Sequence, residues 1–276
     1  MVIDKLKLTT AIKIFALITY FLYFSINFFN LNSISKYPEV LKSDLDLKSK
    51  FLSKSCLVIL GGSNAKTGLS AEILSTNLCN SINLGVDYEA QGFDKYSKWL
   101  DHGNMAEKVL YSTMEVWKSS NKSGNLSDEY FNSIFPRISL FSIIKASFFS
   151  DNKSYNDFGD KINYQCFNVV GSNKTQVQDF SNSNILVAQE ISRRISILKT
   201  IYKTDKIFLR IPPIYLDSNN SKIYKKLMAE RIEVLKEMGI NVIDSTLVSI
   251  DESLFCESNH PNAKGREVFS KEIRLP

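Results

Sequence analysis

Histidine and cysteine are scarce in this chain, and both shortages restrict the chemistry that it can perform. The 276 residues include two histidines, His102 and His260, and four cysteines. No two cysteines are spaced as Cys-x-x-Cys, which excludes a cysteine-rich zinc module. His102 has neither a second histidine at ligand spacing nor a cluster of carboxylates beside it. We therefore expect no metal and no cofactor, and any reaction that needs an imidazole base must use one of two residues.

The chain also lacks a strong excess of charge. Its 34 basic and 29 acidic residues give a formal net charge of +5 at pH 7, and no long basic run is present. This disfavours a dedicated nucleic-acid-binding protein. Apolar residues make up 44% of the chain and charged residues 23%, which excludes global disorder and favours a packed core. The length suits one sizeable α/β domain, or a domain with appendages.

A long apolar run near the amino terminus contains a single charge. Between residues 11 and 31 the only charged side chain is Lys13. About 20 helical residues span the roughly 30 Å core of a bilayer. Two lysines outnumber one aspartate in residues 1–10, so the positive-inside rule places that end in the cytoplasm and the rest of the chain outside. We expect a single-pass membrane anchor at 11–31. A cleaved signal peptide and a buried helix are the alternatives, and the absence of an A-x-A site disfavours the former.

An extracytoplasmic location permits disulfide bonds. Cys56, Cys79, Cys166 and Cys256 allow two bonds in three pairings. A bond between Cys56 and Cys79 is geometrically feasible because these residues precede neighbouring predicted strands. Four buried free thiols are an equal alternative.

After a polar, lysine-rich linker at 32–50, short apolar runs alternate with amphipathic patterns. The apolar runs predict five buried strands, at residues 56–60, 81–85, 108–114, 207–211 and 241–244. The amphipathic patterns predict helices around residues 69–74, 93–100, 187–202, 228–239 and 268–273. One α/β domain over 51–276 with an open parallel sheet and right-handed crossovers follows from this alternation. Residues 118–183 read as an insertion that either packs on the core or forms a lid or membrane-facing surface.

Residues suited to acyl-transfer chemistry stand at the carboxyl ends of the predicted strands, where ligands bind in such sheets. Ser63 follows the first strand in the run Gly-Gly-Ser-Asn, and Gly85 ends the Asn-Leu-Gly turn after the second. His260 follows the last strand, three residues after Glu257. We expect Ser63 as nucleophile, His260 as general base and Glu257 as the acid that orients it. The amides of Ser63 and Gly85 would hold the oxyanion.

Three segments together resemble the blocks of the SGNH/GDSL hydrolase superfamily. Residues 58–69 (VILGGSNAKTGL) resemble the serine block, with Gly62 where many members have aspartate. Residues 83–85 resemble the glycine block, and residues 254–269 (LFCESNHPNAKGREVF) resemble the final block with glutamate in place of aspartate. The resemblance covers about residues 51–276. It implies a flavodoxin-like three-layer α/β/α fold with a parallel five-stranded sheet, preceded here by the transmembrane helix.

The asparagine block of the superfamily has no counterpart. The third strand ends Ser112-Thr113-Met114, so Thr113 or Ser112 must replace the asparagine donor, or the oxyanion hole uses two amides only. Losing one donor typically costs about 10²–10³ in rate, which favours a slow enzyme or an activated acyl donor. The chain is more similar to membrane-anchored members that act in bacterial polysaccharide or teichoic-acid acylation than to secreted lipases.

The sequence therefore predicts an anchored, outward-facing serine esterase or O-acyltransferase that acts on acyl groups, in the first place acetyl groups, of a cell-envelope glycan. The alternative is a non-catalytic accessory or glycan-binding protein that partners a membrane-bound acyltransferase. Tyr88, Trp117 and Tyr215 either stack on sugars or pack in the fold. His102 is expected in a turn at the opposite end of the sheet, which leaves His260 as the base.

Overall fold

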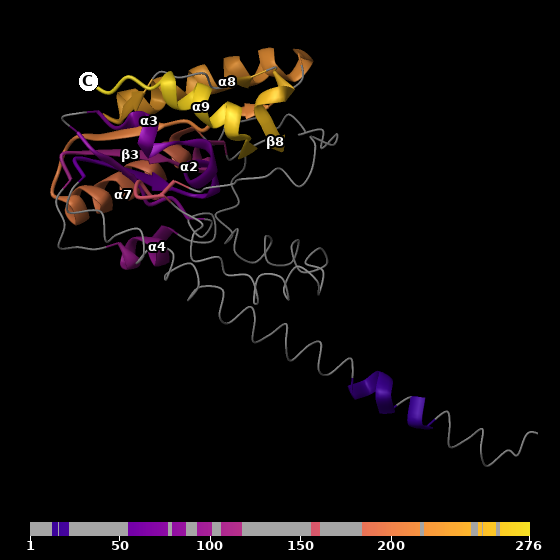
Figure 1. The fold of residues 1–276 in the computed structure, drawn as a ribbon. Helices are drawn as coiled ribbons and strands as arrows, with labels where there is room; N and C mark the ends of the chain where they lie inside the picture. Colours follow the sequence, from indigo (N-terminus) through magenta and orange to yellow (C-terminus); the bar gives the residue numbers. More distant parts are fainter. Residues whose placement is uncertain are drawn as a thin grey trace, which may run out of the picture. The chain divides into compact units, whose positions relative to one another are not determined.

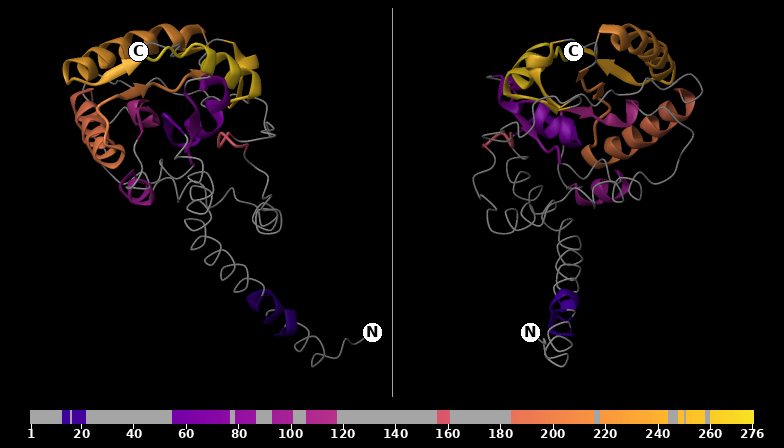
Figure 2. Two further views of the ribbon diagram at one scale, coloured as in Figure 1. Left: turned by 60° about the vertical axis from the view of Figure 1, so that its left-hand side comes forward. Right: turned by 90° about the vertical axis from the view of Figure 1, so that its right-hand side faces the viewer.

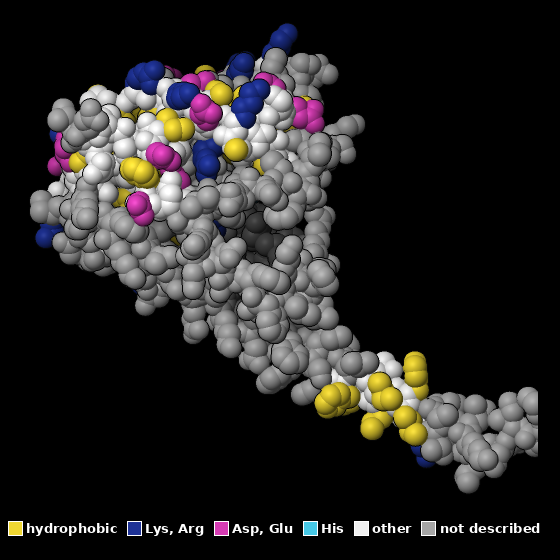
Figure 3. Space-filling view, viewed as in Figure 1, with side chains coloured by type: hydrophobic (Ala, Val, Ile, Leu, Met, Phe, Trp, Pro, Cys, Tyr) yellow, Lys and Arg dark blue, Asp and Glu magenta, His cyan; other side chains and the backbone are white. Residues whose placement is uncertain are grey.

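The computed structural model divides into two compact units, Met1–Lys42 and Ser43–Pro276. The structure describes residues 13–15, 17–21, 55–76, 79–86, 93–100, 106–117, 156–160, 184–215, 218–243, 248–249, 251–257 and 260–276. In the first unit, residues 13–15 and 17–21 are helical and carry exposed apolar side chains (Figure 3). No helix within the described ranges is long and apolar enough to cross a membrane. Most of the predicted anchor at 11–31 lies outside those ranges.

The second unit is built on a five-stranded parallel sheet, as the alternating pattern predicts (Figure 1). The strands lie in the order β2 (Ser81–Asn83), β1 (Leu57–Gly61), β3 (Lys108–Ser112), β4 (Ile207–Arg210) and β6 (Asn241–Ile243). Every neighbouring pair is parallel. The interior strands β1 and β4, on either side of β3, are buried along their whole length, which explains their continuous apolar runs.

Helices cover both faces of the sheet (Figure 2). On one face, α9 (Ala263–Lys271) packs against α2 (Ser63–Gly68) and α3 (Ala71–Leu74). On the other face, α7 (Asn184–Tyr202) packs against α4 (Phe93–Trp99) and α8 (Ser218–Glu237). The α2/α9 face buries Leu57 and Ile59 of β1 against Leu69 and Ile273. The predicted layered α/β domain is thus confirmed.

The predicted helix around residues 69–74 is wrong in one respect, because the chain forms two short helices there. Leu69 and Ser70 are extended and separate α2 from α3. Ser70 ends the irregular stretch by capping α3, since its hydroxyl accepts from the Ile73 amide at 3.3 Å. The hydrophobic pattern continues across this break, so periodicity alone does not reveal it.

Short elements beyond the central sheet complete the carboxyl-terminal half. The turn η3 (Met114–Trp117) follows β3, and β5 (Ile214–Tyr215) pairs in parallel with β7 (Val248–Ser249). The turn η5 (Glu252–Leu254) leads into an antiparallel pair, β8 (Phe255–Glu257) with β9 (His260–Pro261). These runs of two to four residues were not predicted, because they are too short to show a period.

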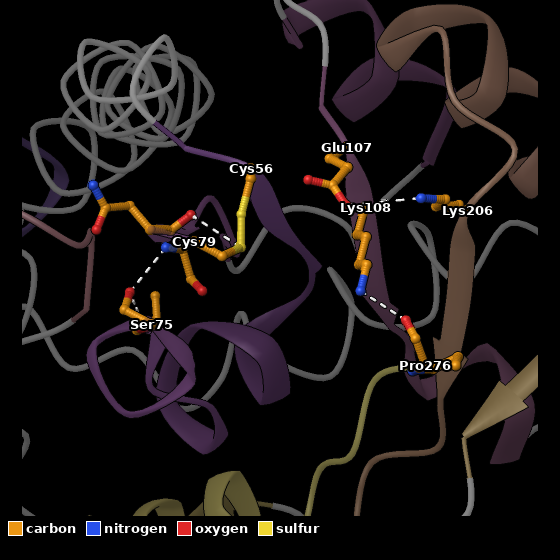
Figure 4. The surroundings of a disulfide bond; sticks show 10 residues. Cys56, Ser75, Cys79, Glu107, Lys108, Lys206 and Pro276 are labelled. Atoms are coloured by element: carbon orange, nitrogen blue, oxygen red, sulfur yellow. Dashed lines mark hydrogen bonds and ion pairs between the residues drawn. A yellow bond between two sulfur atoms is a disulfide. The ribbon is translucent and has the colours of Figure 1, made fainter. Parts of the chain in front are cut away.

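A disulfide joins Cys56 to Cys79 at the amino ends of β1 and β2, with a Cα–Cα distance of 5.5 Å (Figure 4). Cys256 is also disulfide-bonded, and Cys166 lies outside the described residues. The structure holds no free cysteine among the described residues, so the alternative of four free thiols is wrong. Beside the disulfide, the Lys108 ammonium donates to the Pro276 carbonyl at 2.7 Å (Figure 4).

The described part of the predicted insertion packs on the core. Phe158 contacts the cluster on the α2/α9 face. Its carbonyl accepts from the Asn83 amide at 2.8 Å. Residues 156–160 therefore extend the domain beside β2. The apolar patch at 138–149, on which the alternative of a lid or membrane-facing surface depended, lies outside the described residues.

Candidate active site

Ser63 is the first residue of α2, directly beyond the carboxyl end of β1. The chain runs from β1 to β2 on one side and then returns to β3 on the other, so the strand order reverses between β1 and β3. Ligands of open α/β sheets bind at such a switch point. Gly61 makes the sharp exit from β1 with a φ of +141°, and a Cβ atom there would lie 1.8 Å from the Ser112 carbonyl oxygen.

His260 reaches the same place from the other end of the chain. It begins β9, and Pro261 packs on α2, 3.3 Å from the site where Gly68 would carry a Cβ atom. Asn262 then caps α9, because its side-chain oxygen accepts from the Gly265 amide at 2.9 Å. These contacts hold the histidine backbone against the nucleophile helix.

The structure brings Ser63 and His260 together. Ser63 Oγ lies 2.8 Å from His260 Nε2, and the pair is partly buried. In the tautomer that carries its proton on Nδ1, Nε2 of the imidazole accepts a hydrogen bond from the Ser63 hydroxyl. This is the contact that a general base needs in order to remove the hydroxyl proton during attack.

Glu257 ends β8 and stands opposite His260 in the β8–β9 register. The strand pairing therefore brings its backbone beside the histidine. Its role as the acid that orients the imidazole stays a prediction.

The position of Gly85 is set by close packing. A Cβ atom there would lie 2.6 Å from the Lys66 amide nitrogen and 2.9 Å from Ala65 Cβ, so only glycine lets this turn approach α2. Its amide donates to Asn83 Oδ1 at 2.9 Å. Because that hydrogen is engaged inside the turn, oxyanion binding by Gly85 stays a prediction that requires a shift of the turn. The Ser63 amide, in contrast, has no acceptor among the described residues.

The two hydroxyls offered as substitutes for the missing asparagine are buried at the end of β3. Thr113 is 1% exposed, and its Oγ1 accepts from the Glu115 amide at 3.2 Å. Ser112 is fully buried, and its hydroxyl has no partner within the described part of the chain. That Thr113 or Ser112 donates to the oxyanion in place of an asparagine stays a prediction.

Of the three aromatic residues considered for sugar stacking, two pack in the fold. The Trp117 ring lies 6.0 Å from that of Tyr224, and its Nε1 donates to the Pro212 carbonyl at 3.0 Å. The Tyr215 ring lies 6.1 Å from that of Phe255. Tyr88 and His102 lie outside the described residues.

Sequence reasoning missed two buried polar residues behind Ser63. Asn83 is fully buried and Asp160 is 3% exposed, and the two hydrogen-bond to each other. Asn83 is the last residue of β2 and begins the Asn-Leu-Gly run, so its position at the end of a predicted strand was the available signal. Asp160 carried no signal, because it lies in a polar insertion without periodicity. The described residues contain no group of three or more His, Cys, Asp or Glu that could hold a metal ion.

Comparisons with known proteins add no relative to this geometry: no protein-family model, no curated protein and no solved structure matches the chain.

Proposed function

We propose that the protein is a membrane-anchored, outward-facing serine esterase or O-acyltransferase of the SGNH type. Its substrate in this proposal is an acylated, most simply acetylated, glycan of the cell envelope. The observation that carries the proposal is the 2.8 Å approach of Ser63 Oγ to His260 Nε2 at the carboxyl edge of the sheet. Such a pair, on two separate elements at a switch point, suits nucleophilic attack on an ester.

In the proposed reaction, Ser63 Oγ attacks the ester carbonyl while its proton passes to His260 Nε2. The tetrahedral oxyanion is held by the Ser63 amide. The ester bond then breaks, the leaving alcohol takes the proton from the imidazolium, and an acyl-Ser63 intermediate remains. Water then attacks that intermediate in an esterase, and a sugar hydroxyl attacks it in a transferase. His260 removes the proton of either acceptor and returns it to Ser63.

The strand order supports the fold that the resemblance implies. Renumbered along the chain, the central strands lie in the order 2-1-3-4-5, which is the order of flavodoxin-like sheets. We therefore propose the flavodoxin-like arrangement for this domain. In it, the serine block occupies the first strand-to-helix turn and the histidine block precedes the last helix.

Two observations support the proposed topology. Phe15, Leu17 and Phe21 in the apolar amino-terminal segment are each at least 70% exposed, as suits side chains that face lipid. The disulfide between Cys56 and Cys79 suits an oxidising compartment. Both fit an anchor at 11–31 with the second unit outside the cytoplasm.

The test is ester turnover by the full chain purified in detergent, with p-nitrophenyl acetate as substrate. We expect wild type to release p-nitrophenol and both Ser63→Ala and His260→Gln to lose the activity. Ser196→Ala is the matched control, because Ser196 is an exposed serine on α7 whose hydroxyl donates to the Ser192 carbonyl of the same helix. Equal rates in wild type and Ser63→Ala would refute the hydrolase.

Hydrolysis and transfer are separated in the cell. The acetyl content of the surface polysaccharide should rise on deletion of the protein if it is an esterase, and fall if it is a transferase. Complementation with Ser63→Ala should leave the altered content uncorrected in either case.

One observation favours the second candidate, a non-catalytic glycan-binding partner of a membrane acyltransferase. The Gly85 amide is occupied by Asn83 Oδ1, which leaves the Ser63 amide as the available donor of the two predicted oxyanion amides. Under this alternative, deletion still changes polysaccharide acetylation, but complementation with Ser63→Ala restores it.

A further inference from the structure

Helix α2 carries the nucleophile yet is poorly stabilised by its own residues. It has six residues, and its N-cap, Gly62, supplies no side-chain hydrogen bond. A helix this short is marginal unless tertiary contacts fix it. The position of Ser63 relative to His260 must therefore depend on what holds α2 from behind.

Asn83 holds α2 at both ends. Its Nδ2 donates to the carbonyls of Ala65 and Leu69, at 3.0 Å each. Ala65 lies two residues after Ser63, and Leu69 is the C-cap residue that directly follows α2. The same side chain accepts from the Gly85 amide, and Gly85 itself abuts Ala65. One fully buried amide thus fixes the first turn and the end of the nucleophile helix.

Asp160 fixes Asn83 in turn and comes from the inserted segment. Its carboxylate accepts from the Ser70 hydroxyl at 2.8 Å and from the backbone amides of Ala71 and Glu72 at 2.8 and 3.0 Å. It also lies 3.3 Å from Asn83 Nδ2, where it shares a hydrogen with one of the two carbonyls that this NH₂ group bonds. Four donors thus satisfy a buried carboxylate that has no cation beside it among the described residues. Two of these donors are amides at the start of α3, where the helix dipole favours a negative charge.

The inserted segment is itself held at this point. The backbone amide of Asn83 donates to the Phe158 carbonyl. Gly159 has a φ of +72°, and a Cβ atom there would lie 2.5 Å from the backbone carbonyl oxygen of Asn83. Asn156 shapes the turn, because its side-chain oxygen accepts from the amides of Phe158 and Asp160 at 3.0 and 2.9 Å. Backbone and side-chain hydrogen bonds therefore both hold residues 156–160 against Asn83.

We propose that Asp160 and Asn83 are positioning residues for Ser63, and that the inserted segment sets the alignment of the nucleophile through them. Neither residue touches the substrate in this proposal. Asp160 orients the Asn83 amide, and Asn83 holds the carbonyls of α2 so that Ser63 Oγ stays at hydrogen-bond distance from His260 Nε2. The catalytic consequence rests on the proposed function, whereas the alignment itself does not.

Because the chain has only two histidines, imidazole NMR can observe this alignment directly. In the full chain labelled with ¹⁵N-histidine, the His260 signals are those that His260→Gln removes. We expect the Nε2 shift of His260 to change in Ser63→Ala, which removes its partner. Asp160→Asn places an NH₂ group against N–H donors, and should move the His260 shift toward the Ser63→Ala value. The His102 signals serve as the internal reference.

Ser270→Ala is the matched control. It removes the acceptor of the Ser70 amide at the same start of α3, but leaves the contact between Asp160 and Asn83 intact. We expect its His260 shift to equal that of wild type. Asn156 is partly exposed, and Asn156→Ala loosens the turn that presents Asp160. It serves as a second, milder variant if Asp160→Asn fails to fold. It should move the His260 shift in the same direction.

Reactivity gives the second readout. A misplacement of about 1 Å can cost about 10²-fold in rate, so Asp160→Asn should label with a fluorophosphonate about 10- to 100-fold more slowly than wild type. A His260 shift that is identical to wild type in folded Asp160→Asn and Asn156→Ala overturns the inference, as does a wild-type shift that is insensitive to Ser63→Ala. If the expected shifts occur but no ester is turned over, the inference stands and the proposed function fails.

Discussion

Ser63 Oγ lies 2.8 Å from His260 Nε2 although 197 positions separate the two residues in the chain. The serine begins a helix and the histidine begins a short strand, so neither depends on the flexibility of a long loop. The contact is made because α2 and β9 pack against each other through Gly68 and Pro261. Substitutions that disturb this packing should therefore change reactivity before they abolish the fold.

Gly85→Ala should reduce the labelling of Ser63 strongly and destabilise the domain. The added Cβ atom would lie 2.6 Å from the Lys66 amide nitrogen, so α2 must shift. Gly239→Ala is the control, since Gly239 has a φ of +75° but nothing within 4 Å of the added atom. It should cost only about 1 kcal/mol, from backbone strain, and leave labelling unchanged. Equal labelling by the two variants would contradict the claim that the close packing of Gly85 on α2 positions Ser63.

Removal of the disulfide between Cys56 and Cys79 should lower stability without changing the site. The bond closes a loop with a sequence separation of 23, for which chain entropy predicts about 3 kcal/mol. It joins the amino ends of β1 and β2, whereas Ser63 follows the carboxyl end of β1. The double variant Cys56→Ser/Cys79→Ser should unfold at lower urea concentration and still label at Ser63. An unchanged urea midpoint would argue against this bond.

Two buried arginines should differ in how much stability is lost when each is replaced by methionine. Burial lowers the pKa of both guanidinium groups to about 10. Arg231 donates to Asn184 Oδ1 and to the Val116 carbonyl, at 2.8 and 2.7 Å, so Arg231→Met leaves buried acceptors unpaired and should cost about 3 kcal/mol.

Arg210 has one long bond of 3.4 Å to the Phe269 carbonyl, and its Nε has no partner within the described residues. Glu272 attracts this guanidinium, so Arg210→Met leaves that carboxylate without its cation and should still cost stability, but less than Arg231→Met does. Urea unfolding of the two variants measures this contrast. A large loss of stability in Arg210→Met would show that the buried charge is better satisfied than its contacts indicate.

Glu190 should make the stability of the domain depend on pH in the acid range. Its hydrogen bonds to Arg193 lower the pKa of this carboxyl from 4.5 to about 2. A lowered folded-state pKa means that the contribution is complete above pH 4.5 and is lost as the pH falls through 2. Glu190→Gln should thus unfold more readily than wild type at pH 7, and the difference should vanish near pH 2. A difference that grows on acidification would contradict this assignment.

The sequence predicted the central sheet well because each strand is buried and continuously apolar. Leu57–Gly61 and Ile207–Arg210 lie within one residue of the predicted bounds. The break between α2 and α3 was missed because it depends on contacts from Asn83 and Asp160, which are remote in sequence. The same is true of β8 and β9, which are too short to show a pattern.

For the site, chain order predicted the meeting of Ser63 and His260 because parallel strands bring their carboxyl ends to one edge. It could not predict that the Gly85 amide is occupied, since that depends on the rotamer of Asn83. Nor could it find the positioning pair, because Asp160 becomes significant only when the insertion folds back on β2. Long-range hydrogen bonds between polar residues leave no periodic trace in sequence.

The most direct test of the central claim is to identify the residue that a fluorophosphonate modifies in the full chain, by mass spectrometry of the digested protein. The account predicts one modified serine, Ser63, and loss of the modification in folded His260→Gln, which lacks the base. Modification of a different serine, or labelling of Ser63 that is unchanged in His260→Gln, would contradict a nucleophile activated by His260.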